Sequence, residues 1–242
     1  MNAIEIRNLS KRYGELTAVD DLTLDIQAGE TYSLLGVNGA GKTTTVKMLS
    51  CLTKPDSGDA LIFGNSIKSS SANVKSMIAV SPQETSIAPN LTVYENLDMM
   101  AGIYGIPKSE RAAKISGCAS ELGLTDVMGK RSSKLSGGYK RRLSIAMALI
   151  CSPKVLFLDE PTLALDVLAR RELWDVITSL RGKTTIVMTT HYMEEAEQLS
   201  DRIGVLASGR LLFSGTPGEM TAAAGTDDFE EAFVKIVKEA TK

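Results

Sequence analysis

The sequence predicts an α/β domain with a mostly parallel sheet, an antiparallel β subdomain at its N-terminal end and a helical subdomain inserted in the middle. Two observations predict this class. Short apolar runs alternate with helical segments in the outer thirds of the chain, whereas the middle third has helical apolar spacing and several Gly breaks. Alternating strands and helices favour a right-handed parallel sheet, and 242 residues suffice for one large domain.

We therefore expect a single domain over residues 1–242. The insertion begins at a turn-like Ala88-Pro89-Asn90 and ends at Ser152-Pro153. The predicted parts are an α/β core at 1–88 and 153–220, a helical subdomain at 89–152, and a helical tail at 221–242.

The first elements follow from apolar alternation. The isoleucines at 4 and 6, and the apolar residues between Leu22 and Ile26, alternate with polar neighbours, which predicts two half-buried strands. Tyr13 and Gly14 are expected in the connection between them. The next predicted elements are strands at 32–35, 61–63 and 78–80 and a helix from 42 to about 51.

The elements after the insertion are more apolar. The run Val155–Leu158 has no polar residue, as expected of a parallel strand covered on both faces. Apolar residues between Leu173 and Leu180 keep the three-to-four spacing of an amphipathic helix that ends near Gly182. Strands are predicted at 185–190 and 203–206, and a short amphipathic helix at 227–242.

The net charge and the hydropathy of the chain disfavour nucleic-acid-binding, membrane-spanning and secreted classes of protein. A net charge of −2 gives no broad electrostatic reason to bind nucleic acid. No apolar run approaches the ~20 residues that span a bilayer, and the N-terminus lacks the apolar core of a signal peptide. We expect a soluble chain with no nucleic-acid partner.

The segment after the strand at 32–35 matches the phosphate-binding loop pattern GxxxxGK[ST]. Its glycines let successive backbone N–H groups face an anion, and the following helix N-terminus favours negative charge. Lys42 is expected to reach the outer phosphates and Thr43 to ligate Mg²⁺. An ordinary glycine-rich turn is the alternative, which the strand-loop-helix context disfavours. The predicted nucleotide-binding residues are Gly36, Val37, Asn38, Gly39, Ala40, Gly41, Lys42, Thr43 and Thr44.

Other strand ends supply polar side chains. Asp159 and Glu160 follow one predicted strand, His191 follows another, and Gln83 follows a third. Ligands bind beyond the carboxyl ends of parallel strands, so we predict Asp159 near Mg²⁺ and Glu160 as the base that activates water. Adjacent acids also cap helices, but their place directly after four apolar residues and before Pro161 favours catalysis. A lone histidine is more often structural, although His191 can hydrogen-bond a γ-phosphate.

The segment from Leu135 to Arg142 is a small-residue turn that opens a helix. Ser136 is expected to cap that helix, and Ser136, Gly137 and Gly138 together can hold a phosphate. The basic run 140–142 is interpreted as a solvated helix face.

The order of these motifs resembles ATP-binding subunits of ABC transporters, within the P-loop NTPase fold. The match runs from about residue 4 to 217, and Leu135–Tyr139 corresponds to the family signature LSGGQ. The resemblance implies that Tyr13 stacks on adenine, that Gln83 contacts Mg²⁺ and is catalytic, and that Glu160 and His191 are the catalytic carboxylate and the switch histidine. It further implies that the segment 164–166, with Asp166, contacts a second subunit.

The same resemblance gives the signature a role between two chains. Ser136, Gly137 and Gly138 would bind an ATP held by the other subunit, so that two ATP molecules lie between two subunits, identical or not. ATP and Mg²⁺ are the implied cofactors.

Three residues depart from the family pattern. Val37 replaces a common proline, Tyr139 replaces the signature glutamine, and Leu163 is bulkier than usual. None removes a catalytic group, so we expect an active ATPase.

Several segments, among them 43–45 and 190–197, resemble bacterial drug and antibiotic exporters. That branch pairs the ATPase with a separate transmembrane permease, which implies a cytoplasmic chain held at the inner face of the membrane. By analogy, residues 92–100 are the predicted permease surface.

Other classes fit less well. A soluble ABC-type ATPase acting on DNA or ribosomes would share the motifs. Members that act on chromosomes need a long coiled-coil insertion, and those that act in translation usually have a second cassette; this chain has neither. Its net negative charge also disfavours binding to nucleic acid. A small-molecule kinase or GTPase would not need the segment 135–138 or His191. A non-hydrolysing cassette would be expected to lose Glu160 or His191.

Overall fold

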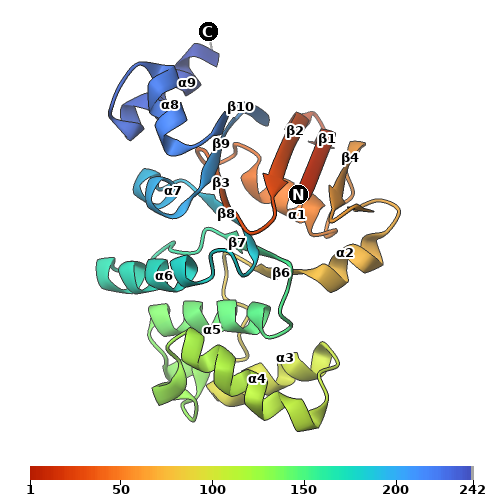
Figure 1. The fold of residues 1–242 in the computed structure, drawn as a ribbon, viewed down its shortest axis with the longest axis vertical. Coiled ribbons are helices and arrows are strands. Elements are labelled where there is room, and N and C mark those ends of the chain that lie inside the picture. Colours follow the sequence, from red (N-terminus) through yellow and green to blue (C-terminus); the bar gives the residue numbers. More distant parts are fainter. Residues whose placement is uncertain (241–242) are drawn as a thin grey trace.

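The computed structural model describes residues 1–240 of the chain (Figure 1). Its first two strands belong to an antiparallel sheet. Strand β1 (Asn2–Tyr13) pairs with β2 (Leu16–Gln27) and with β4 (Ser57–Ile62), and β5 (Asn65–Ser66) extends the edge. The predicted alternation is present, since the isoleucines of β1 are fully buried. Tyr13 ends β1 instead of lying in the connection, because the strands are longer than expected and leave a turn of only two residues.

The second sheet is mostly parallel. Its strand order is β10-β9-β3-β8-β7-β6, and every neighbouring pair is parallel except β10 and β9, which are antiparallel. The strands are β3 (Thr31–Leu35), β6 (Ile78–Ser81), β7 (Val155–Asp159), β8 (Thr185–Thr190), β9 (Arg202–Ala207) and β10 (Arg210–Gly215).

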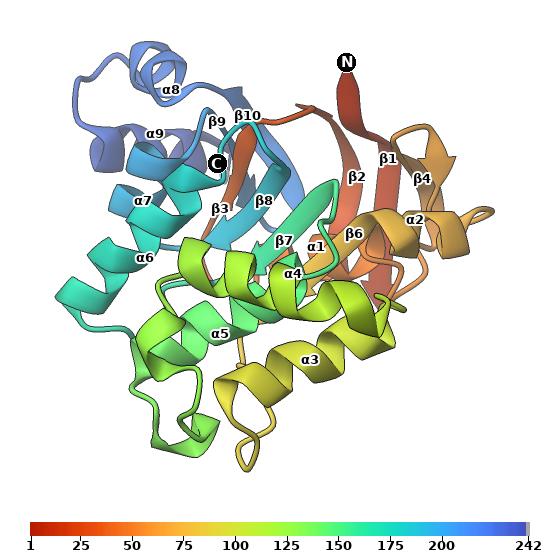
Figure 2. The same cartoon turned by 60° about the horizontal axis from the view of Figure 1, so that its bottom comes forward.

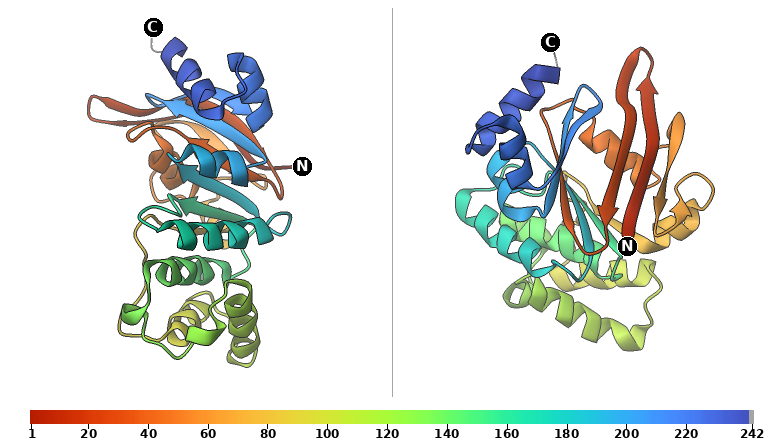
Figure 3. Two further views of the ribbon diagram at one scale, coloured as in Figure 1. Left: turned by 90° about the vertical axis from the view of Figure 1, so that its left-hand side faces the viewer. Right: turned by 45° about the horizontal axis from the view of Figure 1, so that its top comes forward.

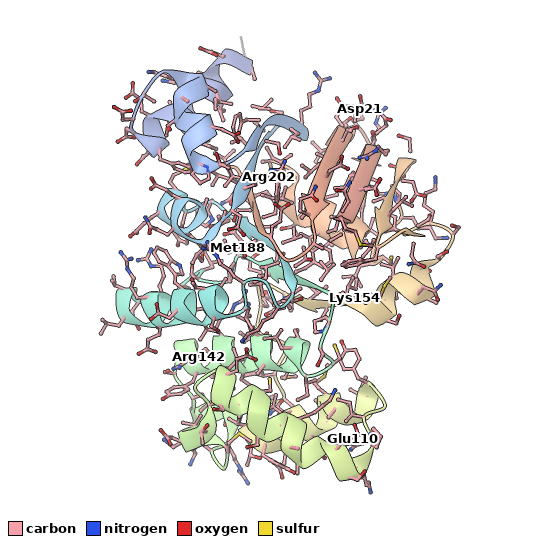
Figure 4. All side chains as sticks on the ribbon, viewed as in Figure 1. Asp21, Glu110, Arg142, Lys154, Met188 and Arg202 are labelled. Atoms are coloured by element: carbon pink, nitrogen blue, oxygen red, sulfur yellow. The ribbon has the colours of Figure 1, made fainter. Side chains whose placement is uncertain are left out.

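Both faces of this sheet are covered. On β7, Val155 and Phe157 pack with the antiparallel sheet and helix α1 (Lys42–Leu49), whereas Leu156 and Leu158 pack with the helices on the other face. Burial on both faces explains why β7 is apolar throughout. Met188 of β8, labelled in Figure 4, belongs to the second of these cores.

The inserted helices lie together at one end of the molecule (Figures 1 and 2). They are α3 (Val93–Ile103), α4 (Lys108–Glu121) and α5 (Gly137–Leu149), with short 3₁₀ turns η1 (Thr125–Val127) and η2 (Ser132–Lys134) between α4 and α5. A reciprocal capping box between Thr92 and Glu95 begins α3.

The remaining helices surround the parallel sheet. They are α2 (Ser71–Met77), α6 (Val167–Ser179), α7 (Met193–Leu199), α8 (Pro217–Ala224) and α9 (Phe229–Ala240). The last two lie at the end of the molecule opposite the inserted helices, where Met220 and Phe233 pack with β9 (Figure 3). No helix within residues 1–240 is long and apolar enough to cross a bilayer.

Candidate functional site

The predicted phosphate loop connects β3 to α1, as its sequence requires. Gly41 is the N-cap of α1 with φ at +104°, and a Cβ there would lie 2.4 Å from the carbonyl oxygen of Ala18. Gly36 is constrained by a close approach alone, since its Cβ would lie 2.4 Å from the carbonyl oxygen of Leu206. Only glycine satisfies both the positive φ and the close approach at position 41.

Helix α1 begins without a side-chain cap, as α2, α4 and α7 also do, whereas Thr92, Ser136, Asp166 and Thr216 cap α3, α5, α6 and α8. The N–H groups of its first turn are therefore left for another acceptor. An anion at this position would satisfy them and would meet the positive end of the helix dipole.

Three charged or ionisable side chains meet beside the loop. Nζ of Lys42 donates to the carbonyl oxygen of Gly36 at 2.6 Å and lies 3.3 Å from Oε1 of Glu160. The other carboxylate oxygen of Glu160 lies 2.7 Å from Nδ1 of His191. Glu160 is only 7% exposed, so these two contacts compensate its burial. The Nδ1 contact leaves Nε2 of His191 for a different partner.

The backbone of Glu160 is held in an uncommon conformation. Its φ is +47°, in the left-handed region that costs a non-glycine residue energy. The N–H of Glu160 donates to both the carbonyl oxygen and the hydroxyl of Thr189 on the neighbouring strand β8.

Asp159 lies one residue earlier, at the end of β7. Its Oδ1 accepts hydrogen bonds from Thr43 at 3.1 Å and from the hydroxyl of Thr189. Sequence reasoning missed Thr189. Because β7 and β8 were both predicted as parallel strands, aligning their carboxyl ends would have placed Thr189 opposite Asp159, as the register does.

Thr43 and Asp159 offer oxygen atoms of the kind that Mg²⁺ prefers. Residues 1–240 contain no group of three or more His, Cys, Asp or Glu side chains suited to a metal. Mg²⁺ commonly combines one or two side-chain ligands with phosphate oxygens. The donor set fits such a shared site.

A pocket of about 300 Å³ unites most of the predicted site. Half-exposed Tyr13 and residues 38–44 line it, together with Gln83, Glu160 and His191. Leu16, Ala18 and Leu163 also line the pocket and were not predicted as site residues. An aromatic ring at the mouth of a phosphate loop can stack on a nucleobase.

The signature residues lie elsewhere. Ser136 caps α5 by accepting a hydrogen bond from the N–H of Tyr139 at 3.4 Å, and a Cβ on Gly138 would approach Ala169 of α6 at 3.0 Å. None of the residues 136–138 lines the phosphate-loop pocket. Within one chain, the two predicted phosphate sites are therefore separate.

The segment around Asp166 lies close to the signature, since a Cβ on Gly137 would lie 3.7 Å from Leu165 and one on Gly138 3.0 Å from Ala169. The carboxylate of Asp166 caps α6 by accepting from the N–H of Ala169 at 2.9 Å, and its neighbours Val167 and Leu168 are exposed. This capping role is compatible with a further contact outside the chain.

The expectation of a solvated basic face at 140–142 is wrong for Arg141. That side chain is 3% exposed and donates only to backbone carbonyls. Arg142, in contrast, pairs with Glu172 and contacts the ring of Tyr139. The helical spacing could have indicated that Arg141 is buried. Arg141 lies three residues after Gly138 and four before Ile145, so that these three buried residues share one face of α5.

Comparison with known proteins identifies the family. The family model described as ABC transporter matches residues 19–163, more than half of the chain. The chain belongs to the ABC transporter family. The resemblance predicted from the order of its motifs is confirmed.

Several relatives of this ABC chain are named for drug resistance or for export. It is 39% identical over 240 residues to the probable multidrug ABC transporter ATP-binding protein YbhF of Escherichia coli (strain K12), covering 97% of this chain and 41% of YbhF. It is 40% identical to the daunorubicin/doxorubicin resistance ATP-binding protein DrrA of Streptomyces peucetius, covering 93% and 68%. It is 43% identical to the Nod factor export ATP-binding protein I of Burkholderia lata, covering 88% and 71%. The chain thus spans less than half of YbhF.

Solved structures of ABC proteins have the same fold. An ATP-binding subunit of an ABC transporter superposes with a TM-score of 0.85 at 27% identity, over 97% of this chain and 99% of that one. The cbiO1 protein of Clostridium perfringens, described as part of the ABC transporter complex cbiONQ, gives 0.85 at 26% identity over 91% of each chain. The predicted α/β P-loop NTPase fold is confirmed.

Proposed function

We propose that the chain is the ATP-binding and ATP-hydrolysing subunit of a membrane exporter, in which ATP binding closes a dimer and hydrolysis reopens it. The observation that carries the hydrolytic part is the position of Glu160. Its carboxylate lies 3.3 Å from Nζ of Lys42 and 2.7 Å from Nδ1 of His191, in the wall of the phosphate-loop pocket. A buried carboxylate there suits the orientation and deprotonation of the attacking water.

The predicted site residues in and beside the pocket then have the following roles. Tyr13 stacks on adenine, while the amides of residues 36–44 and the Lys42 ammonium hold the phosphates. Thr43, Gln83 and Asp159 would hold Mg²⁺, which would neutralise phosphate charge. His191, anchored by Glu160 through Nδ1, hydrogen-bonds the γ-phosphate and registers its loss.

The remaining predicted residues act between chains. Ser136, Gly137 and Gly138 bind the ATP of a second ATPase subunit, and Asp166 lies at the same contact. Their separation from the pocket in one chain supports this arrangement. ATP, as the ligand that binds the closed dimer better, supplies the differential affinity that a two-state switch requires.

A transmembrane permease is the proposed second partner, through the surface at residues 92–100. The export and resistance named in the relatives support this partner, as does the transporter complex that includes cbiO1. The chain would then act at the cytoplasmic face of the membrane, peripherally.

The variant Glu160→Gln tests the proposal. It keeps the shape of the side chain but removes the base, so ATP hydrolysis should fall at least about 100-fold, while ATP still binds and an ATP-bound dimer accumulates. Hydrolysis is measured by phosphate release, binding by nucleotide titration and assembly by size-exclusion chromatography. Glu197→Gln, an exposed change on α7, is the matched control. Normal turnover of Glu160→Gln would refute the role of Glu160.

A further inference from the structure

One buried side chain of the signature helix contacts both loops that carry proposed catalytic groups. Arg141 of α5 donates from Nε to the carbonyl oxygen of Pro161 at 2.7 Å and from Nη2 to that of Asp159 at 2.9 Å. Its Nη1 donates to the carbonyl oxygens of Pro82 and, at 3.4 Å, of Gln83. The guanidinium therefore joins α5 to the segments that follow β6 and β7.

The acceptors on the β7 side flank Glu160. Asp159 and Pro161 are the residues immediately before and after it, and the N–H of Glu160 itself is held by Thr189. These hydrogen bonds restrain the backbone on both sides of a residue whose φ is +47°. Restraint by the surroundings is what allows a non-glycine residue to keep this conformation.

The chemistry of arginine suits these carbonyls. Arg141 forms no ion pair with any carboxylate among residues 1–240, although it is 3% exposed. Burial lowers the pKa of Arg141 to about 10, opposed by the charges of Asp159 and Glu195, so the side chain stays protonated at neutral pH. A buried cation is tolerated when it is hydrogen-bonded, and a planar guanidinium has five N–H donors in a fixed fork that lysine cannot reproduce.

We propose that Arg141 is a positioning residue for ATP hydrolysis, which holds Gln83 and Glu160 in register with the helix that begins at the signature. The proposal rests on the proposed ATPase function. Arg141 does not itself line the pocket, and its hydrogen bonds go to no phosphate-loop residue. Its loss should therefore slow the chemical step, which is sensitive to misplacements of about 1 Å, and should leave ATP binding to the loop intact.

Two variants test this role. Arg141→Met keeps the length of the aliphatic stem and removes every donor, and Arg141→Lys keeps the charge but not the fork. We expect kcat to fall at least about 10-fold in both, with the Kd for ATP within about threefold of the unaltered chain. Arg142→Met, which changes the neighbouring arginine paired with Glu172, is the matched control and should keep kcat within about twofold. Thermal unfolding is recorded for all chains.

A second readout does not depend on activity. Hydrogen exchange of the backbone amides of residues 83–87 and 159–160 should be faster in Arg141→Met than in Arg142→Met. The reason is that the Arg141→Met variant lacks the hydrogen bonds from the guanidinium to both segments. Unaltered kcat in a folded Arg141→Lys or Arg141→Met chain would overturn the proposal, and so would unfolding of both variants, which would make Arg141 a residue of general stability. If the unaltered chain hydrolyses no ATP, the proposed ATPase function fails. Unchanged hydrogen exchange in the two segments would refute only the positioning role of Arg141.

Discussion

Five charged side chains in or near the phosphate-loop pocket are each less than a tenth exposed: Lys42, Arg141, Asp159, Glu160 and Glu195. Burial of charge requires compensation. Lys42 and Glu160 compensate each other, and carbonyl groups compensate Arg141. Glu195 of α7 is fully buried, and neither of its carboxylate oxygens makes a well-formed hydrogen bond within residues 1–240.

The environment of Glu195 predicts a pH dependence of stability. Burial raises the pKa of Glu195, assisted by the charge of Glu160 and opposed by nearby Thr190, Thr162 and Trp174. The folded state therefore keeps this proton to higher pH than the unfolded chain, whose glutamates titrate near ~4.3. The contribution to stability is complete below that value and is lost as pH rises through the folded-state pKa.

Glu195→Gln removes this titration. As the pH is raised from 5 to 8, the Tm of the variant should rise relative to that of the unaltered chain. At the higher pH the folded unaltered chain must either ionise a buried acid or keep a proton that the unfolded chain has released, and the variant avoids both costs. Differential scanning fluorimetry at both pH values measures the gain. The exposed neighbour Glu194→Gln serves as control and should show no such trend. A Tm difference that is the same at both pH values would contradict the raised pKa.

At the scale of elements, the phosphate loop depends on how α1 begins. Gly41→Ala combines positive φ with a Cβ placed 2.4 Å from the carbonyl oxygen of Ala18, so the loop must move. We expect a loss of about 1–3 kcal/mol of stability and at least a 10-fold weaker affinity for ATP, since the N–H groups no longer converge.

The control for this change is Gly64→Ala. Gly64 also has positive φ, at +77°, but a Cβ there meets nothing within 4 Å. Its cost should be strain alone, about 1 kcal/mol, with ATP affinity unchanged. Chemical denaturation and nucleotide titration compare the two variants; equal affinities would show that the close approach at position 41 does not shape the loop.

Prediction from sequence succeeded where a pattern repeats locally. The strand at 185–190 has the predicted bounds, and β7 and β3 differ from prediction by one residue each, because an apolar run between turns is itself the signal. Strand β10 was missed, since Arg210–Gly215 is an edge strand with partly exposed side chains and no clear alternation. Helix α8 was missed although Thr216 and Glu219 form a capping box around Pro217.

The site was predictable in its groups and not in its contacts. Motifs located Lys42, Glu160 and His191, but nothing local indicates that Glu160 bridges the other two. The positions of Thr189 and Arg141 depend on strand register and on helix packing, which join residues far apart in the sequence. The subdomain limits at 89 and 152 and the catalytic roles stay predictions.

At the scale of the whole molecule, the fold separates the two predicted phosphate sites. The phosphate loop connects β3 of the parallel sheet to α1, whereas Ser136 caps α5 of the inserted helices (Figure 2). In the proposed dimer, a second copy related by twofold symmetry brings the signature of each chain to the pocket of the other. In that proposed dimer, each ATP site depends on residues of both chains.

Mixing two inactive variants tests this dependence. Ser136→Ala damages the signature and Lys42→Ala the phosphate loop, so each homodimer has two defective sites. A mixed dimer has one doubly defective site and one intact site, because the intact loop of one chain meets the intact signature of the other. Equal mixing should restore ATP hydrolysis to about a quarter of the unaltered rate if the sites act independently. Each variant is first checked for folding, since Ser136 also caps α5 at a cost of about 1 kcal/mol. If both groups served one site within a single chain, mixing would restore nothing.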